Sequence, residues 1–378
     1  MEVEFKPFNL HAGITEKAIK DVVEEYNEKA QNNKIWLFFD EINTCNHIGL
    51  LADLIAHRMF DGKQIHPNIR LFAACNPYRI REKSVSNVGL IAQNIFKEQS
   101  RLVYEVKPLP DQILDYVWDY GILQSKDERN YIQIMVQETE LGNPILAELL
   151  FESQEFIRYV EEPYSISLRD VKRAIKLVKF FHQSLLTRKE ENKKYPGNSP
   201  DIVTRTYILA LGLCYQSRLY DRKLRTNYHE TMCKIFQKNN RKYKSLNEDK
   251  FNKIIREEQM NFMNRMTCPP NTALNEALLE NVLSIIVCIL CKVPLFIVSS
   301  PGSSKSLAIK LVQQNLRGTD SNDEYFKKLP QVIFVFHQGS LSSTSEGIKK
   351  VFDKAKACQE KFSKDFPIVS VVLLDEGN

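Results

Sequence analysis

Two acidic dipeptides, each at the end of an apolar run, are the residues of this chain best suited to metal and water chemistry. Asp40 and Glu41 end the first run, and Asp375 and Glu376 end the second. An aspartate at the end of a buried strand can hold the shell of a Mg²⁺ ion, and the glutamate after it can orient or deprotonate an attacking water. One such string is common, but two copies favour a nucleotide-hydrolysing enzyme.

A serine-rich loop with a lysine, residues 299–306, precedes the second acidic pair and has the form of a phosphate-binding loop. A loop between a buried strand and a helix directs backbone N–H groups at one point, where the helix N-terminus adds positive potential, so phosphate is its natural ligand. Lys305 is expected to reach the β- and γ-phosphates of ATP, and Ser306 to bind Mg²⁺. The other residues expected to contact the nucleotide are Gly302, Ser303 and Ser304.

This loop departs from the pattern Gly-x-x-x-x-Gly-Lys-Ser at two positions. Ser299 and Ser304 stand where glycines are expected. A positive φ at either serine would strain the loop, because only glycine adopts that conformation without cost. The alternative interpretation is a plain serine-rich turn, but the flanking strand and helix and the later Asp375 argue against it.

A polar residue also closes the apolar run that follows the first acidic pair. Asn76 ends the run 69–75 and can help to position the water that Glu41 would activate. Its simpler alternative is a turn asparagine before Pro77.

Strands and helices alternate around the first acidic pair, which predicts an α/β fold with a parallel sheet. The all-apolar run 35–39 is typical of a strand buried on both faces, and 69–75 and 102–106 are expected to be further strands. Helical periodicity marks 14–29 and 48–57.

From residue 111 the apolar period changes to that of a helix, which predicts an all-helical region after the sheet. A basic, proline-marked stretch at 187–200 interrupts it, and the lysine-rich stretch 234–258 is expected to be a polar helix with flexible flanks. The expected helices are 113–118, 130–137, 145–159, 168–185 and 202–219.

A second α/β unit begins near residue 271. Its order of strand, loop with lysine, helix, strand, helix and acidic strand is that of a P-loop ATPase core. The expected strands are 294–298, 332–336 and 367–374, and the expected helices are 274–290, 307–316 and 345–361.

Composition excludes several other classes of protein. The 378 residues are 43% hydrophobic and carry a net charge of only +5, so the chain is globular and its charge does not call for nucleic acid. A polyanion could contact Lys238, Arg241, Lys242 and Lys244 around Tyr243, but a solvated helix face is the simpler explanation.

Eight cysteines are scattered without the spacing of a disulfide framework, which indicates a reducing, cytoplasmic environment. Cys288 and Cys291 have the spacing of a metal site, but no second pair follows and the surrounding run is apolar, so we expect both thiols in the core. The start is too polar for a signal peptide. Lys292 and Pro294 interrupt the most apolar stretch, so no transmembrane segment is expected.

The residues around both acidic pairs resemble the mysterin family, which comprises giant RING-finger AAA+ E3 ubiquitin ligases with a dynein-like tandem of AAA modules. The closest likeness lies at 40–55 and 67–78, and it extends through 102–106, 109–121 and 301–307 over nearly the whole chain. The phosphate loop of that family also has serine at the position of Ser304, whereas Ser299 still departs from its glycine.

The resemblance implies a role for each candidate residue. Asp40 and Glu41 correspond to Walker B and Asn76 to sensor 1 of one module. Arg169 resembles a sensor 2 arginine of the helical lid, and Arg101 is a candidate arginine finger, for which an ordinary surface arginine is the equal alternative. In the next module, Walker A is represented by Lys305 and Ser306 and Walker B by Asp375 and Glu376.

The same resemblance implies a domain organisation with open sheet edges. In the family's strand order 5-1-4-3-2, the first module lacks strand 1 and the second has strands 1 to 3 only, which leaves long open edges, normally an aggregation risk. The resemblance also implies that the arginine finger comes from a neighbouring module, so that neither pocket is complete in this chain. The expected regions are an AAA+ core without its Walker A strand and loop (1–110), an α-helical lid (111–230), a polar linker (231–270) and the N-terminal half of the next module (271–378).

The leading hypothesis is an ATP-binding and ATP-hydrolysing AAA+ segment of a mysterin-like E3 ubiquitin ligase, with Mg²⁺ and ATP as cofactors. Its expected partners are the neighbouring AAA modules and, through the parent protein, the ubiquitin machinery. The chain has no RING domain and no cysteine–histidine cluster to replace one. The alternative is a catalytically inactive fragment that acts as a protein-interaction module.

Overall fold

The computed structural model describes residues 3–77, 106–161, 163–191, 200–239, 245–299, 302–340, 343–362 and 367–375. The chain divides into two compact units, Met1–Ile122 and Leu123–Asn378, here called the first and second unit. Several predictions fall outside the described residues. These are Arg101, Glu376, the strand at 102–106 apart from Val106, and the basic residues at 241–244.

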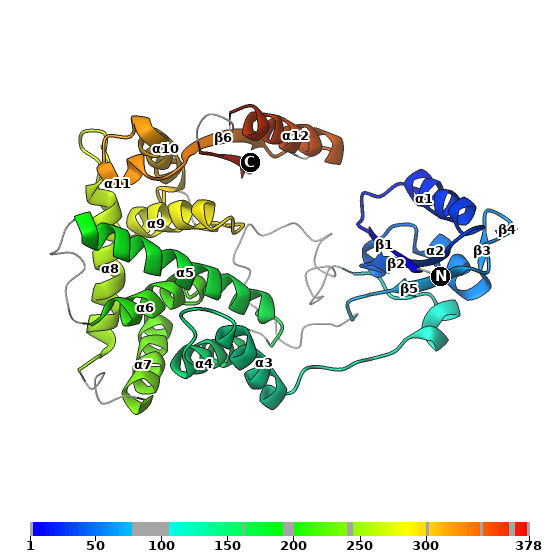
Figure 1. The fold of residues 1–378 in the computed structure, drawn as a ribbon, viewed down its shortest axis with the longest axis horizontal. Helices are drawn as coiled ribbons and strands as arrows, with labels where there is room; N and C mark the ends of the chain where they lie inside the picture. The colour runs from blue at the N-terminus through cyan, green and yellow to red at the C-terminus, as the bar shows by residue number, and fades with distance from the viewer. Residues whose placement is uncertain are drawn as a thin grey trace. The chain divides into compact units, whose positions relative to one another are not determined.

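The first unit contains a parallel three-stranded sheet in the order β1-β2-β5 (Figure 1). β2 (Lys34–Asp40) and β5 (Ile69–Ala73) are the predicted strands, and the odd residues of β2 from Ile35 to Phe39 are buried. β1 (Val3–Asn9) was not predicted. Its residues alternate between exposed and half-buried and include Pro7, as suits an edge strand whose pattern is too polar to read from the sequence.

Two helices and several short elements complete the first unit. Thr15 caps α1 (Glu16–Lys29) by accepting a hydrogen bond from the N–H of Ala18, and α2 (Ile48–His57) follows β2. Their buried residues form one core with the sheet, which includes Ile19, Leu37 and Leu51. The short elements are η1 (Ile42–Thr44), the hairpin of β3 (Met59–Phe60) and β4 (Lys63–Gln64), and η4 (Asp111–Tyr116).

The second unit begins with helices, as the change of period predicted (Figure 1). The expected polar segment 234–258 is different in the structure, because it is divided between two amphipathic helices, α7 (Arg222–Asn239) and α8 (Glu248–Asn264), with buried residues such as Phe236 and Phe251. The helices are α3 (Ser125–Gln137), α4 (Pro144–Val160), α5 (Leu168–Glu191), α6 (Ile202–Cys214), η5 (Gln216–Arg218), α7 (Arg222–Asn239), α8 (Glu248–Asn264) and α9 (Glu276–Leu290).

A small α/β part follows α9 in the same unit. It consists of α10 (Lys305–Asn315), η7 (Gly318–Asp320), α11 (Glu324–Lys327), β6 (Gln331–Gln338), α12 (Ser345–Phe362) and β7 (Ile368–Asp375). β6 and β7 form a parallel pair in register from Gln331↔Ile368 to Gln338↔Asp375. The α/β fold class with parallel sheets is therefore confirmed.

The strand predicted at 294–298 does not form. No strand among the described residues pairs with this segment, and Phe296 and Val298 are 89% and 68% exposed. The apolar pattern was correct for a buried strand, but a strand also needs a partner for its backbone groups. In the strand order 5-1-4-3-2 that the resemblance implies, the segment 294–298 corresponds to strand 1, whose neighbours are strands 5 and 4. β6 and β7 correspond to strands 2 and 3, so neither is its partner.

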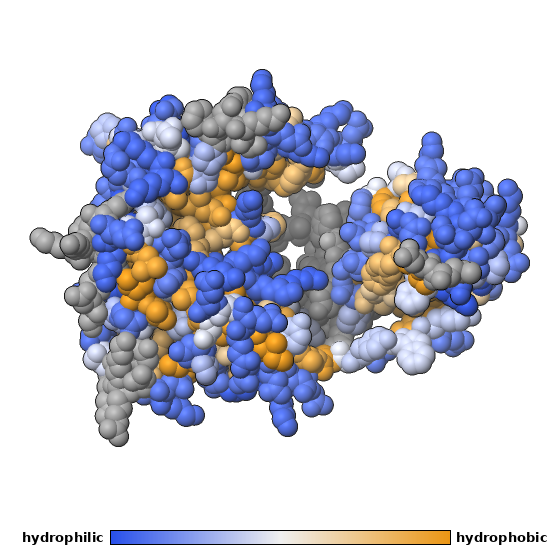
Figure 2. Space-filling model, in the orientation of Figure 1, coloured by the Kyte–Doolittle hydropathy of each residue, from blue (hydrophilic) through white to orange (hydrophobic). Residues whose placement is uncertain are grey.

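One hydrophobic core runs through the second unit, from Ile132 in α3 to Phe334 in β6. The helices and the α/β part therefore share a core instead of forming two separate ones. Figure 2 shows apolar surface over α9 and next to β6. The exposed large apolar side chains of the α/β part include Phe296, Phe336 and Leu374. In the described part of the chain, every helix is too short or too polar to span a lipid bilayer.

Candidate functional site

The C-terminal end of β2 places the first acidic pair. Asp40 is the last residue of the strand, and Glu41 leaves it with φ 58° and ψ 41°, a left-handed conformation that turns the chain into η1. The N–H of Glu41 donates to Asp40 Oδ1 at 3.1 Å, and both side chains are half-buried. A non-glycine residue in this conformation is unusual and needs support from its surroundings.

That support comes from β5, the parallel neighbour of β2. The N–H of Ala74 donates to the carbonyl of Phe39, and the N–H of Ile42 donates to the carbonyl of Ala74, both at 2.9 Å. These bonds bring the chain after β5 beside Glu41, where Asn76 Nδ2 donates to Glu41 Oε2 at 2.8 Å. The structure thus brings together Asp40, Glu41 and Asn76, and the amide fixes one oxygen of the glutamate.

Asn43 is a member of this cluster that the sequence analysis missed. It is buried, and its Nδ2 donates to the backbone carbonyl of Asn76 at 2.7 Å. Asn43 therefore fixes the position of Asn76, which in turn donates a hydrogen bond to Glu41. No periodic pattern could have found it, because the contact joins two loops that only the pairing of β2 and β5 brings together.

The acidic pair also affects the pKa of the thiol of Cys75, the residue before Asn76. Partial burial of the sulfur, followed by the negative charge of Glu41, raises the pKa of Cys75. This thiol therefore stays protonated at neutral pH.

The phosphate loop lies in the second unit, where α10 begins at Lys305. Gly302 has φ 82° and Ser304 has φ 62°, whereas no positive φ is found at Ser299. The sequence analysis named Ser299 and Ser304 as possible sites of backbone strain, and the structure shows this strain at Ser304. A left-handed conformation costs a non-glycine residue about 1–2 kcal/mol.

Lys305 is folded back onto its own loop. Its Nζ donates to the carbonyl of Ser299 at 2.7 Å. The hydroxyl groups of Ser299 and Ser303 also form a hydrogen bond with each other. A Cβ at Gly302 would meet no other atom within 4 Å, so the loop is open on that side. Ser306 follows Lys305 in the first turn of α10 and is exposed.

Helix α9 supplies two loop contacts that the sequence analysis did not identify. Asn281 Nδ2 donates to the carbonyl of Ser303 at 3.0 Å, and Asn275 Nδ2 donates to Ser304 Oγ at 3.3 Å. The sequence signal for Asn275 is that of an N-cap residue, whose Oδ1 accepts from the N–H of Leu278. Nothing in the sequence connects either asparagine with the loop.

The second acidic pair is built less completely than the first. Asp375 is the last residue of β7, where its backbone carbonyl accepts from the N–H of Gly339, but its side chain is exposed. Within the described residues no hydrogen bond joins Asp375 to the phosphate loop. The structure therefore confirms the predicted strand end, and among the described residues it shows no hydrogen bond between Asp375 and Ser306.

Arg169 lies in the first turn of α5. Its backbone N–H donates to Ser167 Oγ at 3.3 Å, and Asp170 Oδ2 accepts from the N–H of Ser167, which together cap the helix. The arginine side chain is exposed.

The side chains fit a Mg²⁺ ion that is carried mainly by a nucleotide. No group of three or more His, Cys, Asp or Glu side chains in the described ranges could hold a metal ion. Mg²⁺ commonly takes one or two protein ligands and completes its shell with phosphate oxygens and waters. Ser306 and Asp375 in the second unit and, separately, Asp40 in the first unit carry oxygen atoms of the kind that such a site uses.

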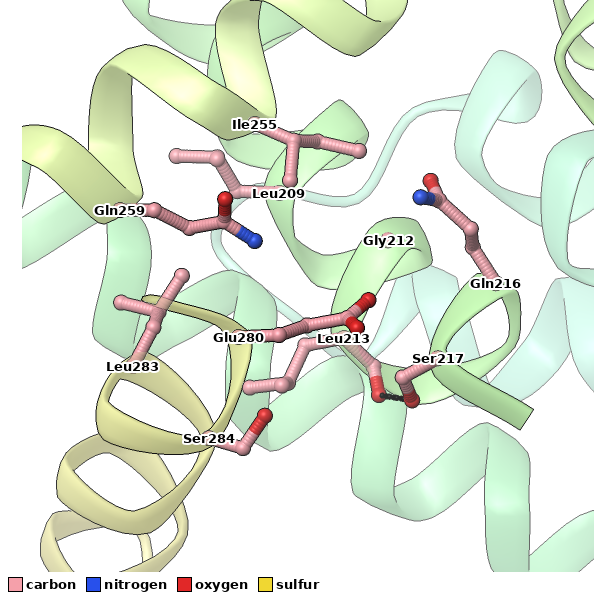
Figure 3. A pocket seen from close by; sticks show the side chains of 10 residues that line it. All are labelled: Leu209, Gly212, Leu213, Gln216, Ser217, Ile255, Gln259, Glu280, Leu283 and Ser284. Carbon is pink, nitrogen blue, oxygen red and sulfur yellow. Dashed lines mark hydrogen bonds between the residues drawn. The ribbon is translucent and has the colours of Figure 1, made fainter. Parts of the chain in front are cut away.

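A cavity between α6, α8 and α9 is too small to be a nucleotide site (Figure 3). Its volume of about 20 Å³ has room for about one water molecule. The helices are close here, since a Cβ at Gly212 would lie 2.7 Å from Ile255 Cδ1. Its polar lining includes Gln216, Gln259 and Glu280.

Comparison with known proteins finds the same family at both ends of the chain. The family description "RNF213 AAA domain" matches residues 2–79 and again residues 271–378. The chain is 32% identical to "E3 ubiquitin-protein ligase RNF213" of Homo sapiens over 98% of its own length, and 32% identical to the Mus musculus protein of that name. It is 30% identical to "E3 ubiquitin-protein ligase rnf213-beta" of Danio rerio. The chain spans only about 8% of the length of these relatives.

Proposed function

Because this chain is an AAA+ segment of the RNF213/mysterin type, we propose that it binds Mg-ATP and takes part in its hydrolysis. The phosphate loop and the acidic pair of the first unit fall in different AAA-domain matches, so we assign them to two different modules. The regions 1–110, 111–230 and 271–378 then serve as AAA+ core, lid and next half-module. The region 231–270, expected from the sequence as a polar linker, includes most of α8 and the end of α7, which pack in the core of the second unit.

The geometry of the phosphate loop is the observation that carries this proposal. Two positive φ angles, at Gly302 and Ser304, bend the chain directly before the first turn of α10. A bend of this kind turns successive N–H groups toward one concave site, and the helix N-terminus favours negative charge there. Lys305 is the cation of this site.

Each residue of the loop has a distinct task when a nucleotide enters. Lys305 Nζ would exchange the carbonyl of Ser299 for oxygens of the β- and γ-phosphates, and Ser306 would offer its hydroxyl to Mg²⁺. Bound Mg²⁺ would neutralise charge that develops on the phosphates. Asp375, with the glutamate that follows it, would complete the metal shell and orient water from the end of β7.

The acidic pair of the first unit would serve the preceding module in the same way. Asp40 would contribute to the Mg²⁺ shell, while Glu41, with one oxygen held by Asn76, would orient the attacking water. Arg169 would contact the phosphates as sensor 2 from the lid, and Arg101 is the candidate finger toward a neighbouring module.

The relatives carry the words E3 ubiquitin-protein ligase in their names. We therefore propose that this segment belongs to the AAA+ part of such a ligase in the cytoplasm, where nucleotide state changes the packing between modules and neighbouring modules complete each pocket. Ubiquitin transfer itself would belong to other parts of the parent protein.

Calorimetry of Mg-ATP binding tests the proposal. The purified chain should bind Mg-ATP weakly but saturably, and Lys305→Ala should weaken binding by at least about tenfold, because a charge-assisted contact worth roughly 1.4 kcal/mol or more is lost. Lys310→Ala is the matched control, since Lys310 is an exposed lysine of the same helix. Equal affinity of Lys305→Ala and the parent chain would exclude this loop as the phosphate site.

A non-catalytic interaction module is the second candidate function. Trp118 and Tyr120 are 80% and 94% exposed in the first unit, and aromatic side chains of this kind are enriched in protein interfaces. A folded chain that binds no Mg-ATP would favour this alternative.

A further inference from the structure

Helix α9 contacts the phosphate loop through two asparagine amides. Asn275, the N-cap residue, reaches the hydroxyl of Ser304, and Asn281 reaches the backbone carbonyl of Ser303. α9 itself is firmly anchored, because it packs against α10 and most of its residues from Leu278 to Cys288 are buried. The two amides therefore connect a rigid helix with the most strained part of the loop.

That strain is located at Ser304. Its φ of 62° is rarely adopted by residues with a side chain, and such a conformation persists only where surrounding contacts impose it. Ser304 directly precedes the first residue of α10, so a relaxed φ would redirect the chain between Gly302 and Lys305. The two contacts from α9 flank the peptide bond between Ser303 and Ser304. Asn281 binds the carbonyl of Ser303, and Asn275 binds the hydroxyl of Ser304.

The contact from Asn281 also sets the direction of a backbone donor. The carbonyl of Ser303 and the N–H of Ser304 belong to one trans peptide plane, in which they point in opposite directions. Since the carbonyl points to Asn281, the N–H of Ser304 points away from α9. An N–H directly before the first turn of a helix is one of the donors that can bind a phosphate oxygen.

We propose that Asn281 and Asn275 are positioning residues of the phosphate loop, a role that rests on the proposed binding of Mg-ATP. They touch no phosphate themselves. They hold Ser304 in its left-handed conformation and keep its N–H directed into the loop. Loss of either amide lets the loop relax and weakens phosphate binding, while Lys305 and Ser306 stay in place on α10.

Two substitutions remove the amides with little other change. Asn281→Leu keeps a similar volume and loses the donor to Ser303. Asn275→Ser keeps a good N-cap for α9 but loses the amide donor to Ser304. Asn239→Leu is the matched control, because its amide donates to a backbone carbonyl within α7 and has no contact with the loop. Ser304→Gly removes the strain, since glycine adopts a positive φ freely.

The first readout is amide hydrogen exchange of a peptide that covers residues 302–306, measured without nucleotide. Asn281→Leu should speed exchange there, and Asn239→Leu should not. The second readout is Mg-ATP affinity by calorimetry, which Asn281→Leu should weaken about five- to tenfold, the loss expected for one hydrogen bond. Adding Ser304→Gly to Asn281→Leu should restore most of the affinity, because a glycine loop no longer needs the support.

The outcomes separate this inference from the proposed function. Unchanged exchange in Asn281→Leu, or an affinity that Ser304→Gly does not restore, would overturn the positioning role. If the parent chain binds no Mg-ATP, the proposed function fails, and the exchange experiment alone still decides whether the asparagines hold the loop. If Asn281→Leu unfolds the second unit, Asn275→Ser, which preserves the helix cap, provides the same test through the hydroxyl of Ser304.

Discussion

The two acidic strand ends have the same sequence form but different surroundings. β2 lies between β1 and β5, and the chain after β5 returns to place Asn76 on Glu41. β7 has β6 as its only strand neighbour within the described residues, and the side chain of Asp375 is exposed. The comparison teaches that a neighbouring strand, and not the apolar-Asp-Glu string itself, gives the carboxylates their contacts.

The two units also differ in how they are held together. The core of the first unit is built around one three-stranded sheet. The core of the second unit runs from the helices into the α/β part and encloses an ion pair. We therefore expect the two units to unfold separately. Removal of a charged side chain from the buried ion pair should lower the stability of the second unit and not that of the first.

The largest expected effect comes from the buried ion pair. Arg188 in α5 and Glu258 in α8 are 0% and 1% exposed, and Arg188 also donates to Asn261 Oδ1 at 2.7 Å. The guanidinium lies over the rings of Phe262 and Tyr325. Arg188→Met leaves the glutamate buried without its cation, so it should lower the free energy of unfolding of the second unit by about 3–5 kcal/mol. Urea unfolding followed by hydrogen exchange of each unit measures this.

Two further variants show whether the units are independent. Arg188→Met combined with Glu258→Leu removes both charges and should recover most of the lost stability. Leu37→Ala in β2 creates a cavity in the first unit and should destabilise that unit alone, by about 2–5 kcal/mol. A shift of both units by either Arg188→Met or Leu37→Ala would contradict the comparison.

A smaller effect should appear on acidification, again in the second unit. His229 is buried, its Nε2 lies 2.8 Å from Gln216 Oε1, and its ring stacks on Phe251. Burial, and then the positive charge of Arg225, lowers the pKa of His229 to about 4. The unfolded chain therefore binds a proton near pH 6.5 that the folded chain takes up only near pH 4.

Stability from this histidine is fully present above about pH 6.5 and is lost as the pH falls toward 4, by up to about 3 kcal/mol. Urea unfolding at intervals between pH 4 and 8 should show this slope in the second unit. His229→Gln should flatten the slope, because glutamine does not titrate in this range. An unchanged slope in His229→Gln would assign the pH dependence to other groups.

The parts of the fold that the sequence predicted are those in which local pattern and final packing agree. The runs that became β2, β5, β6 and β7 are apolar over most of their central residues, although Ile69 is the one buried residue of β5. The strand ends at Asp40 and Asp375 follow from the same change of pattern, whereas α10, expected from residue 307, begins at Lys305. No pairing information was needed to place these boundaries.

The errors have the opposite origin, because they depend on partners. β1 was missed, since its alternating polar residues suit an edge strand that only its pairing with β2 defines. The strand expected at 294–298 has the pattern but no partner among the described residues. Likewise, nothing in the sequence indicates the contacts of Asn43, Asn275 and Asn281 described above, because each of these residues contacts a segment that is brought near by packing.

The smallest expected effect tests the opening comparison directly. Asn76→Ala removes the amide that holds Glu41, and a half-buried hydrogen bond to a carboxylate should contribute about 1 kcal/mol to the stability of the first unit. Asp375→Asn is the matched change in the second unit. Because that side chain is exposed, the change should cost less than about 0.5 kcal/mol. Urea unfolding of both variants at pH 7 measures the difference, and equal costs would mean that the two strand ends are built alike.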